Sequence, residues 1–296
     1  MGNSQSKLAE QIHDQYFTPV ETAKWCYELA NNQLGWDFVG TALEPSVGAF
    51  AFVQAATELG LRLEWTTNDM FPQQDSAPDH VSDFRELSLT GFDYCITNPP
   101  FGKANSLAKT FAKKGCEIAT RCMMVLPRGA MRMGFRDAMP RHNELVIESL
   151  LPSEEFVTSC GQTKIVKTCM MAWERVEYRV PTIKETLDLR TNLIEHWGSD
   201  GPDWDTKKGP IDFQIARWGR MGHIFSPEKM KQSGARISVV CKNISRDDFI
   251  RVHESIDLED FVEKSSNHPP AFDVPEWLHR FNQRAAELGL QPQKAE

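Results

Sequence analysis

The chain has 296 residues, of which 41% are hydrophobic and 25% charged, and its formal net charge is −8. This composition is typical of a globular protein, and no apolar run approaches the ~18 residues of a membrane-spanning helix. The acidic balance argues against a general nucleic-acid binder, because phosphate contacts require local Lys and Arg. Seven scattered cysteines without a C-x-x-C pair indicate reduced thiols and no metal site of the zinc type.

The first residues, MGNSQSK, match the loose pattern for N-myristoylation at Gly2. A polar start is the favoured interpretation, because the pattern is short and the acyl chain needs a eukaryotic transferase. We therefore expect no membrane partner and a cytoplasmic location, in a bacterial or phage-infected cell.

Strand-like and helix-like segments alternate from residue 41 to residue 172. We expect helices at AFVQAATELG (51–60) and ANSLAKTFAKKG (104–115). The expected strands are TALE (41–44), LRLEWTTN (61–68), HVSDF (80–84), FDYCIT (92–97) and CMMVL (122–126). Such alternation predicts an α/β fold with a mostly parallel sheet and helices on both faces. Two more strands around a Cys-Gly turn, within 153–176, are expected to add an antiparallel hairpin at the end of that sheet.

The pattern changes near residue 180, where we place a domain boundary. Residues 1–180 form the predicted catalytic domain, and residues 181–265 a smaller C-terminal region without clear α/β alternation. Residues 266–296 hold a linker and an amphipathic helix, with Trp277, Phe281, Ala285 and Leu288 on one side. That helix could pack on its own domain or on a second subunit, so both a monomer and a homodimer stay open.

The strand FDYCIT ends in Asn98, Pro99, Pro100 and Phe101. The prolines hold Asn98 extended and remove two N–H donors, which leaves the Asn98 side-chain oxygen and the Pro99 carbonyl as acceptors. Two such acceptors suit a substrate NH₂, and Phe101 can lie against the ring that carries it. Holding both hydrogens favours a pyramidal nitrogen whose lone pair points at an electrophile. Alone, the stretch could also be a plain strand end.

About fifty residues upstream, the strand TALE ends in Glu44 and is followed by Pro45, Ser46, Gly48 and a helix. Ligands bind open α/β sheets at the carboxyl ends of the strands. Gly48 allows close backbone approach, and the Glu44 carboxylate can meet an ammonium group. This loop and the later proline stop together predict a ligand site at one edge of the sheet.

The segments QYFTP (15–19), LEPSVGAF (43–50) and TNPPF (97–101) resemble motifs of the S-adenosylmethionine-dependent amino-methyltransferases that modify the exocyclic amine of adenine in DNA. Their order is that of the γ arrangement, in which a target-recognition region follows the catalytic domain. The resemblance covers about residues 13–180 and implies a Rossmann-like class I methyltransferase sheet. One position departs from the family, because Phe50 stands where a second glycine is usual.

The resemblance implies S-adenosyl-L-methionine as cofactor and gives roles to the matching residues. Thr18 would contact the methionine carboxylate, and Glu44 and the loop after it would hold the methionine end. Asp69 would take the ribose hydroxyls, with Glu64 and Asn68 as alternatives on the same strand. The full predicted cofactor set is Phe17, Thr18, Glu44, Pro45, Ser46, Gly48, Asp69, Asp83, Phe84 and Asn98.

Asp83 would meet the adenine amine of the cofactor, with Phe84 beside that ring. Asn98 and Pro99 would hold the target amine, and Phe101 would stack on a flipped base; with Pro100 these residues form the predicted catalytic set. Singly, the acidic residues could be helix caps or strand ends and Thr18-Pro19 a plain helix start. Their joint order favours the functional interpretation.

Three functions remain open. The protein could methylate adenine in DNA, it could methylate an RNA adenine or a protein glutamine, or it could be a non-catalytic relative that binds nucleic acid. The intact proline motif argues against the last. Between residues 205 and 251 stand ten Lys/Arg and five Asp/Glu, a local charge of +5. This excess favours double-stranded DNA, from which the target base must flip out, over a charged face without a ligand. The predicted nucleic-acid contacts are Arg128, Arg132, Arg217 and Arg220.

Overall fold

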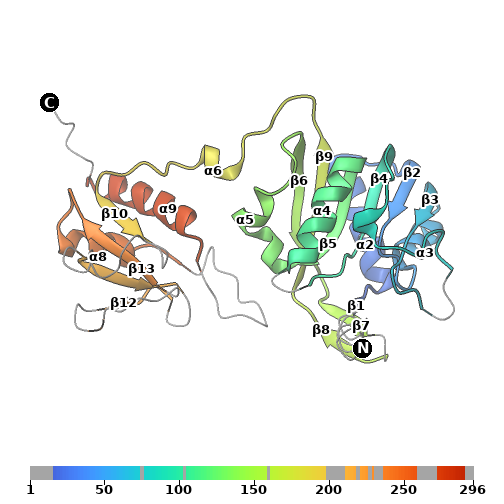
Figure 1. The fold of residues 1–296 in the computed structure, drawn as a ribbon, viewed down its shortest axis with the longest axis horizontal. Coiled ribbons are helices and arrows are strands. Elements are labelled where there is room, and N and C mark those ends of the chain that lie inside the picture. The colour runs from blue at the N-terminus through green and yellow to red at the C-terminus, as the bar shows by residue number, and fades with distance from the viewer. Residues whose placement is uncertain are drawn as a thin grey trace. The chain divides into compact units, whose positions relative to one another are not determined.

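The computed structural model describes residues 16–73, 77–102, 105–158, 161–197, 211–217, 221–225, 229, 236–258 and 272–290. The chain divides into two compact units, the first ending at Thr182 and the second beginning at Ile183. Each unit has its own sheet and its own hydrophobic core (Figure 1). The predicted subdivision of the C-terminal part into a recognition region and a linker stays a prediction.

The N-terminal unit is built on a six-stranded sheet in the order β3-β2-β4-β5-β9-β6. Strands β3, β2, β4 and β5 run parallel, and β9 is antiparallel to both of its neighbours. The predicted α/β, Rossmann-like sheet with an antiparallel end is therefore confirmed. The strand bounds are β2 Val39–Glu44, β3 Arg62–Thr67, β4 Phe92–Thr97, β5 Ala119–Pro127, β6 Asn143–Leu150 and β9 Thr168–Arg175.

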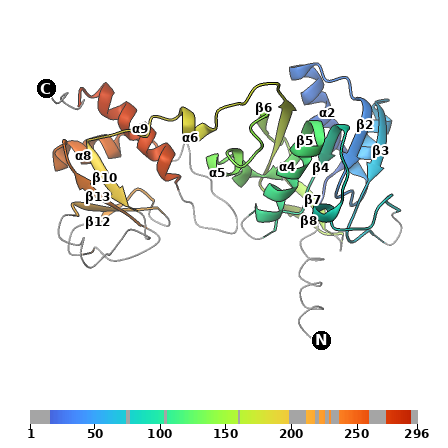
Figure 2. The ribbon, with the colours of Figure 1, turned by 45° about the horizontal axis from the view of Figure 1, so that its top comes forward.

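Helices cover both faces of this sheet because alternate strand residues point to opposite sides (Figure 2). Tyr94 and Ile96 of β4 join one core cluster with helices α2 (Val20–Leu34) and α3 (Ala51–Glu58). Cys95, between them, joins the opposite cluster with helices α4 (Ser106–Ile118) and α5 (Met133–Arg136). Helix α2 is an addition to the elements expected from the sequence.

The segment predicted as a hairpin, 153–176, is divided between two sheets. Its last part is β9, an antiparallel strand of the main sheet, and the prediction was wrong only for the part before it. The strands of that earlier part, β7 (Glu155–Thr158) and β8 (Thr163–Ile165), form a separate small sheet with β1 (Tyr16–Phe17). The antiparallel end of the main sheet is the pair β9 and β6. Strand β1 pairs with β7, which is far from it in the sequence. Local sequence patterns do not reveal such a long-range pairing.

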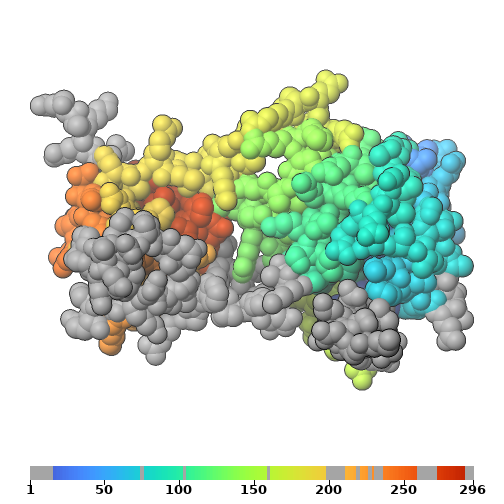
Figure 3. Space-filling view, viewed as in Figure 1, coloured from blue at the N-terminus to red at the C-terminus, as the bar shows by residue number. Residues whose placement is uncertain are grey.

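The segment HVSDF is also not a regular strand. His80 forms one isolated parallel bridge with Asn68, and a 3₁₀ turn, η1 (Phe84–Glu86), follows. A second 3₁₀ turn, η3 (Arg128–Met131), follows β5. On the face seen in Figure 3, the cyan and green segments form much of the surface of the N-terminal unit, so the connections after β3 and β4 reach solvent.

The C-terminal unit contains a four-stranded antiparallel sheet in the order β10-β13-β11-β12. Its helix α9 buries Trp277 and Phe281 against Phe249 of α8, so it packs within its own unit. Among the described residues, no helix combines the length and apolar character that a membrane crossing requires. The bounds are α6 Ile183–Thr186, β10 Ile194–Trp197, β11 Phe213–Ala216, β12 Ile224–Phe225, β13 Arg236–Cys241, α8 Arg246–Glu254 and α9 Val274–Glu287.

Candidate active site

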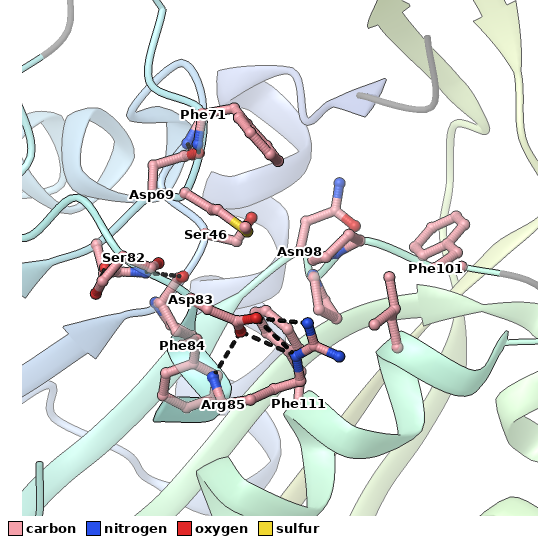
Figure 4. A pocket seen from close by; sticks show the side chains of 18 of the residues that line it. Ser46, Asp69, Phe71, Ser82, Asp83, Phe84, Arg85, Asn98, Phe101 and Phe111 are labelled. Carbon is pink, nitrogen blue, oxygen red and sulfur yellow. Dashed lines mark hydrogen bonds and ion pairs between the residues drawn. The ribbon is translucent and has the colours of Figure 1, made fainter. Parts of the chain in front are cut away.

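A cavity of about 420 Å³ lies in the N-terminal unit, beside the carboxyl ends of β2, β3 and β4 (Figure 4). Its volume falls in the ~300–1,000 Å³ range of small-molecule sites. Most of the predicted site residues share this one cavity, although they come from five separate segments of the chain. Those that line it are Phe17, Pro45, Ser46, Gly48, Asp69, Asp83, Phe84, Asn98, Pro99, Pro100 and Phe101.

Two predicted cofactor residues, Glu44 and Thr18, do not line the cavity but lie buried next to residues that do. The backbone N–H of Ser46 donates to the Glu44 carboxyl at 3.2 Å. Burial raises the pKa of this carboxyl well above its usual range, because the charged form loses its hydration. The Thr18 hydroxyl finds no hydrogen-bond partner among the described residues.

The loop between β2 and α3 has the close backbone approach expected of its glycine. Gly48 has a φ of +52°, and a Cβ there would lie 3.0 Å from the Phe17 ring. Phe50, at the position of the family's second glycine, also adopts a left-handed conformation with a φ of 61°. The backbone therefore keeps the shape that favours glycine, although an L-residue other than Gly, Asn or Asp adopts it only at a steric cost.

Two neighbouring polar residues after β3 hold the cavity wall together. Asn68 donates to the carbonyls of Pro45 (3.0 Å) and Ser82 (3.1 Å). The Asp69 carboxylate accepts from the backbone N–H groups of Gly48 and Phe71, both at 2.8 Å. Asn68 is thus a structural link that the sequence did not identify as one. Glu64, the other alternative for the ribose, is not a lining residue.

Asp83 and Phe84 are held by residues that sequence reasoning missed. Arg85 donates to the Asp83 carboxylate from its backbone and from its guanidinium, each at 2.9 Å. This pairing holds the pKa of Asp83 below its usual range, so the carboxylate stays an acceptor. Figure 4 shows the two side chains facing each other at the cavity.

Lys114 of α4 fixes the same turn from behind. Its ammonium donates to the carbonyls of Phe84 (2.6 Å), Leu87 (2.7 Å) and Arg85 (3.0 Å). It also lies 4.8 Å from the centre of the Phe84 ring, which packs on Phe111 at 4.9 Å. A lysine three residues after a buried phenylalanine is a weak signal, and it gave no reason to expect this role.

Asn98 has one satisfied and one open end. Its Nδ2 donates to the Tyr16 carbonyl at 3.0 Å, which fixes the orientation of the amide. Its Oδ1 is buried and has no hydrogen-bond partner among the described residues. Since buried acceptors are normally paired, this oxygen is available for a donor that enters the cavity.

The predicted nucleic-acid contacts are less uniform. Arg128 forms an ion pair with Glu154 and is half-buried. Arg132 is half-buried on the segment that follows β5, and Arg217 is half-buried at the end of β11. Asp212, which precedes the same strand, forms an ion pair with Arg246. Arg220, like Gly2, lies outside the described residues.

No family model and no curated relative matches this chain. Among solved structures it is similar to a Pyrococcus horikoshii protein described as a "putative RNA methyltransferase" (17% identity, 55% of this chain and 86% of that one, TM-score 0.45). It is also similar to TrmN from Thermus thermophilus (17% identity, 52% and 48%, TM-score 0.38). Both likenesses are partial.

The six-stranded, mostly parallel sheet has the α/β, Rossmann-like architecture predicted above. The residues present fit the S-adenosyl-L-methionine that the sequence predicts as cofactor. A buried carboxyl stands behind the Gly48 loop, an ionised carboxylate and a phenylalanine stand at Asp83 and Phe84, and Asp69 lies between them along the cavity wall.

Proposed function

We propose that this protein is a methyltransferase that moves a methyl group from S-adenosyl-L-methionine to the N6 amine of adenine in double-stranded DNA. One observation carries the proposal: Asn98 lines the cavity that also gathers the predicted cofactor residues, and its buried Oδ1 has no hydrogen-bond partner among the described residues. An amine with two hydrogens can donate one to this oxygen and one to the Pro99 carbonyl.

Asn98 would act by placing an acceptor rather than by removing a proton. The Tyr16 carbonyl accepts from Asn98 Nδ2 and so holds the amide, which leaves Oδ1 for a donor from the substrate. An adenine amine is a poor nucleophile because its lone pair is delocalised into the ring. Two fixed acceptors stabilise the pyramidal form, in which the lone pair is free to attack, and such preorganised dipoles cost no reorganisation during the reaction.

The bound cofactor would supply an electrophilic methyl group. Glu44, Ser46 and Gly48 would hold its methionine end, Asp69 its ribose, and Asp83 with Phe84 its adenine. The open Thr18 hydroxyl supports a contact near the methionine end, because an unpaired buried hydroxyl is costly until a ligand meets it.

DNA is favoured over RNA and protein as the acceptor by the basic excess between residues 205 and 251. Arg132 and Arg217 are proposed contacts to the phosphate backbone or to base edges. We propose that the target base flips out to reach Asn98, that the enzyme acts in the cytoplasm, and that it does so as a monomer or homodimer.

Long-read sequencing of DNA and RNA from cells that express the wild type or Asn98→Ala tests the proposal. We expect modified adenine in DNA, in one sequence context, with the wild type and not with the variant. Modification confined to RNA would replace DNA as the substrate. If neither DNA nor RNA is modified, and the methyl group is found on protein instead, the proposal is overturned.

A further inference from the structure

Tyr16 belongs to the small sheet β1-β7-β8, and no role in the site has so far been assigned to its side chain. Its backbone carbonyl accepts from Asn98 Nδ2, and its side chain lines the same cavity as Phe101. The two rings are close to parallel, with an interplanar angle of 27° and their centroids 6.3 Å apart. Tyr16 and Phe101 thus stand as two aromatic faces beside the open oxygen of Asn98.

The near-parallel orientation of these rings suits one more planar ring in the gap between them. Two successive contacts between aromatic carbon atoms at ~3.5 Å need ~7 Å between the two ring planes. Both rings are half-buried. Entry of a flat ligand therefore requires a side-chain rotation that brings the two planes to this separation.

The Phe101 side of this gap is held by its backbone. Gly102 follows with a φ of +68°, and a Cβ there would lie 2.7 Å from Leu107 of α4. The Tyr16 side is held by pairing of β1 with β7, where Tyr16 stands opposite Thr158. Neither ring depends on the other for its position.

We propose that Tyr16 is a substrate-binding residue, and that its ring and that of Phe101 clamp the heteroaromatic ring whose amine Asn98 holds. The inference rests on the proposed function, because it places the acceptor amine at Asn98. It also narrows the substrate class. Two stacking faces recognise a nucleobase, whereas a glutamine side chain has no ring to fill the gap.

Binding of 2-aminopurine riboside tests the clamp without turnover. S-adenosylhomocysteine at saturating concentration fills the cofactor site first, so that the probe reports the acceptor site. We expect saturable quenching of the probe's fluorescence by the wild type. Loss of one stacking face should weaken binding by about 5- to 150-fold in Tyr16→Ala, the range for a stacked base.

Two variants control for structure. Tyr16→Phe keeps the ring and should recover most of the binding, and all variants at this position keep the backbone carbonyl that orients Asn98. Tyr178→Ala removes a tyrosine that is 66% exposed and should bind the probe like the wild type. Thermal unfolding of Tyr16→Ala checks that it folds, and Tyr16→Leu replaces it if it does not.

Tritium transfer from S-adenosylmethionine to DNA, RNA and protein is measured with the same variants. Transfer to DNA together with equal probe binding by wild type and Tyr16→Ala would overturn the clamp and leave the proposed function standing. Probe binding that needs Tyr16, with transfer to RNA alone, would keep the clamp and overturn the choice of DNA. A wild type that does not quench the probe overturns the clamp, and transfer to protein alone overturns both.

Discussion

Asn98 in the N-terminal unit and His253 in the C-terminal unit are both polar groups inside the protein, and they differ in how completely they are paired. His253 accepts from Trp277 Nε1 at Nδ1 (3.2 Å), and its Nε2 donates to the Gly222 carbonyl (2.8 Å). Asn98 uses its Nδ2 on the Tyr16 carbonyl and keeps a buried oxygen open. The first arrangement is complete without a ligand, and the second is not.

An open polar atom indicates function only where others converge on the same cavity. Asn143, at the start of β6, has both side-chain polar atoms buried without a hydrogen-bond partner among the described residues, yet it is not a lining residue. Asn98 differs because Asp69, Asp83 and the Gly48 loop line the cavity with it. Convergence of several groups, rather than one unpaired atom, distinguishes an active site from a local defect.

Asn98→Ala removes the open oxygen and should have the largest effect. We expect methyl transfer to fall by about 10²–10³-fold, as for loss of one placed transition-state partner, while the cofactor still binds. Calorimetric titration with S-adenosylmethionine, run beside tritium transfer, separates the two. Near-normal transfer by the variant would show that the open oxygen is not used.

Lys114→Met should have the next largest effect, on the cofactor rather than on the acceptor. Without the ammonium, the carbonyls of Phe84, Arg85 and Leu87 lose their common donor, and the turn that carries Asp83 loosens. We expect affinity for S-adenosylmethionine to fall about tenfold, the effect of one lost charge-assisted hydrogen bond.

Lys113→Met is the matched control, because its exposed ammonium only reaches Glu117, at 4.0 Å. Its cofactor affinity should equal that of the wild type. An equal loss in both variants, or none in either, would mean that Lys114 does not position the turn.

The sequence predicts the parts of this site that depend on local patterns. It does not predict the contacts between residues that are far apart in the chain. Strands β2, β3, β4 and β5 contain several β-branched, aromatic or other apolar residues and lie next to turn residues, so local pattern located them, and the motifs at the ends of β2 and β4 marked the cavity. Lys114 acts through backbone carbonyls, which carry no residue signature. The contact between Tyr16 and Asn98 joins residues 82 apart in the chain.

The C-terminal sheet escaped prediction for another reason. Its strands β10, β11 and β12 are two to four residues long, too short to show a period of two. Helix α9 was predictable because its fourteen residues repeat Trp277, Phe281 and Ala285 at a spacing of four. Length alone was not sufficient, because α2, with fifteen residues, was also not expected from the sequence.

Glu44→Gln should change stability by a smaller amount, on the order of 1 kcal/mol for a buried polar substitution. The pKa of Glu44 is raised in the folded state, so its contribution to stability is present at low pH and is lost as the pH rises toward that pKa. The variant should therefore be more stable than the wild type at pH 8 and nearly equal to it at pH 4.

Urea unfolding of the ligand-free protein at both pH values measures this difference. The affinity for S-adenosylmethionine should fall in Glu44→Gln, because glutamine cannot carry the negative charge that the ammonium group of the cofactor would meet. A variant that is less stable at pH 8, or that binds the cofactor as tightly as the wild type, would contradict the assigned environment of Glu44.

The smallest effect on stability is expected at His253, because both of its ring nitrogens already have hydrogen-bond partners. Burial lowers the pKa of His253 below its usual value near 6.5, so the unfolded chain takes up a proton more readily than the folded one. Stability from this group is present above about pH 6.5 and is lost as the pH falls toward the folded-state pKa, with a slope of at most ~1.4 kcal/mol per pH unit. Thermal unfolding between pH 5 and 8, in the wild type and in His253→Gln, measures the slope of stability against pH, which should be shallower in the variant.

Some slope of stability against pH should remain in His253→Gln, because burial also lowers the pKa of His196. Methyl transfer at pH 8 should be unaffected by this titration, because the neutral His253 ring is already fully paired at that pH. A wild-type stability that stays constant or rises on acidification would show that the folded state accommodates the imidazolium. His253 would then not be a polar group whose pairing is complete only in the neutral form, as the comparison with Asn98 assumes.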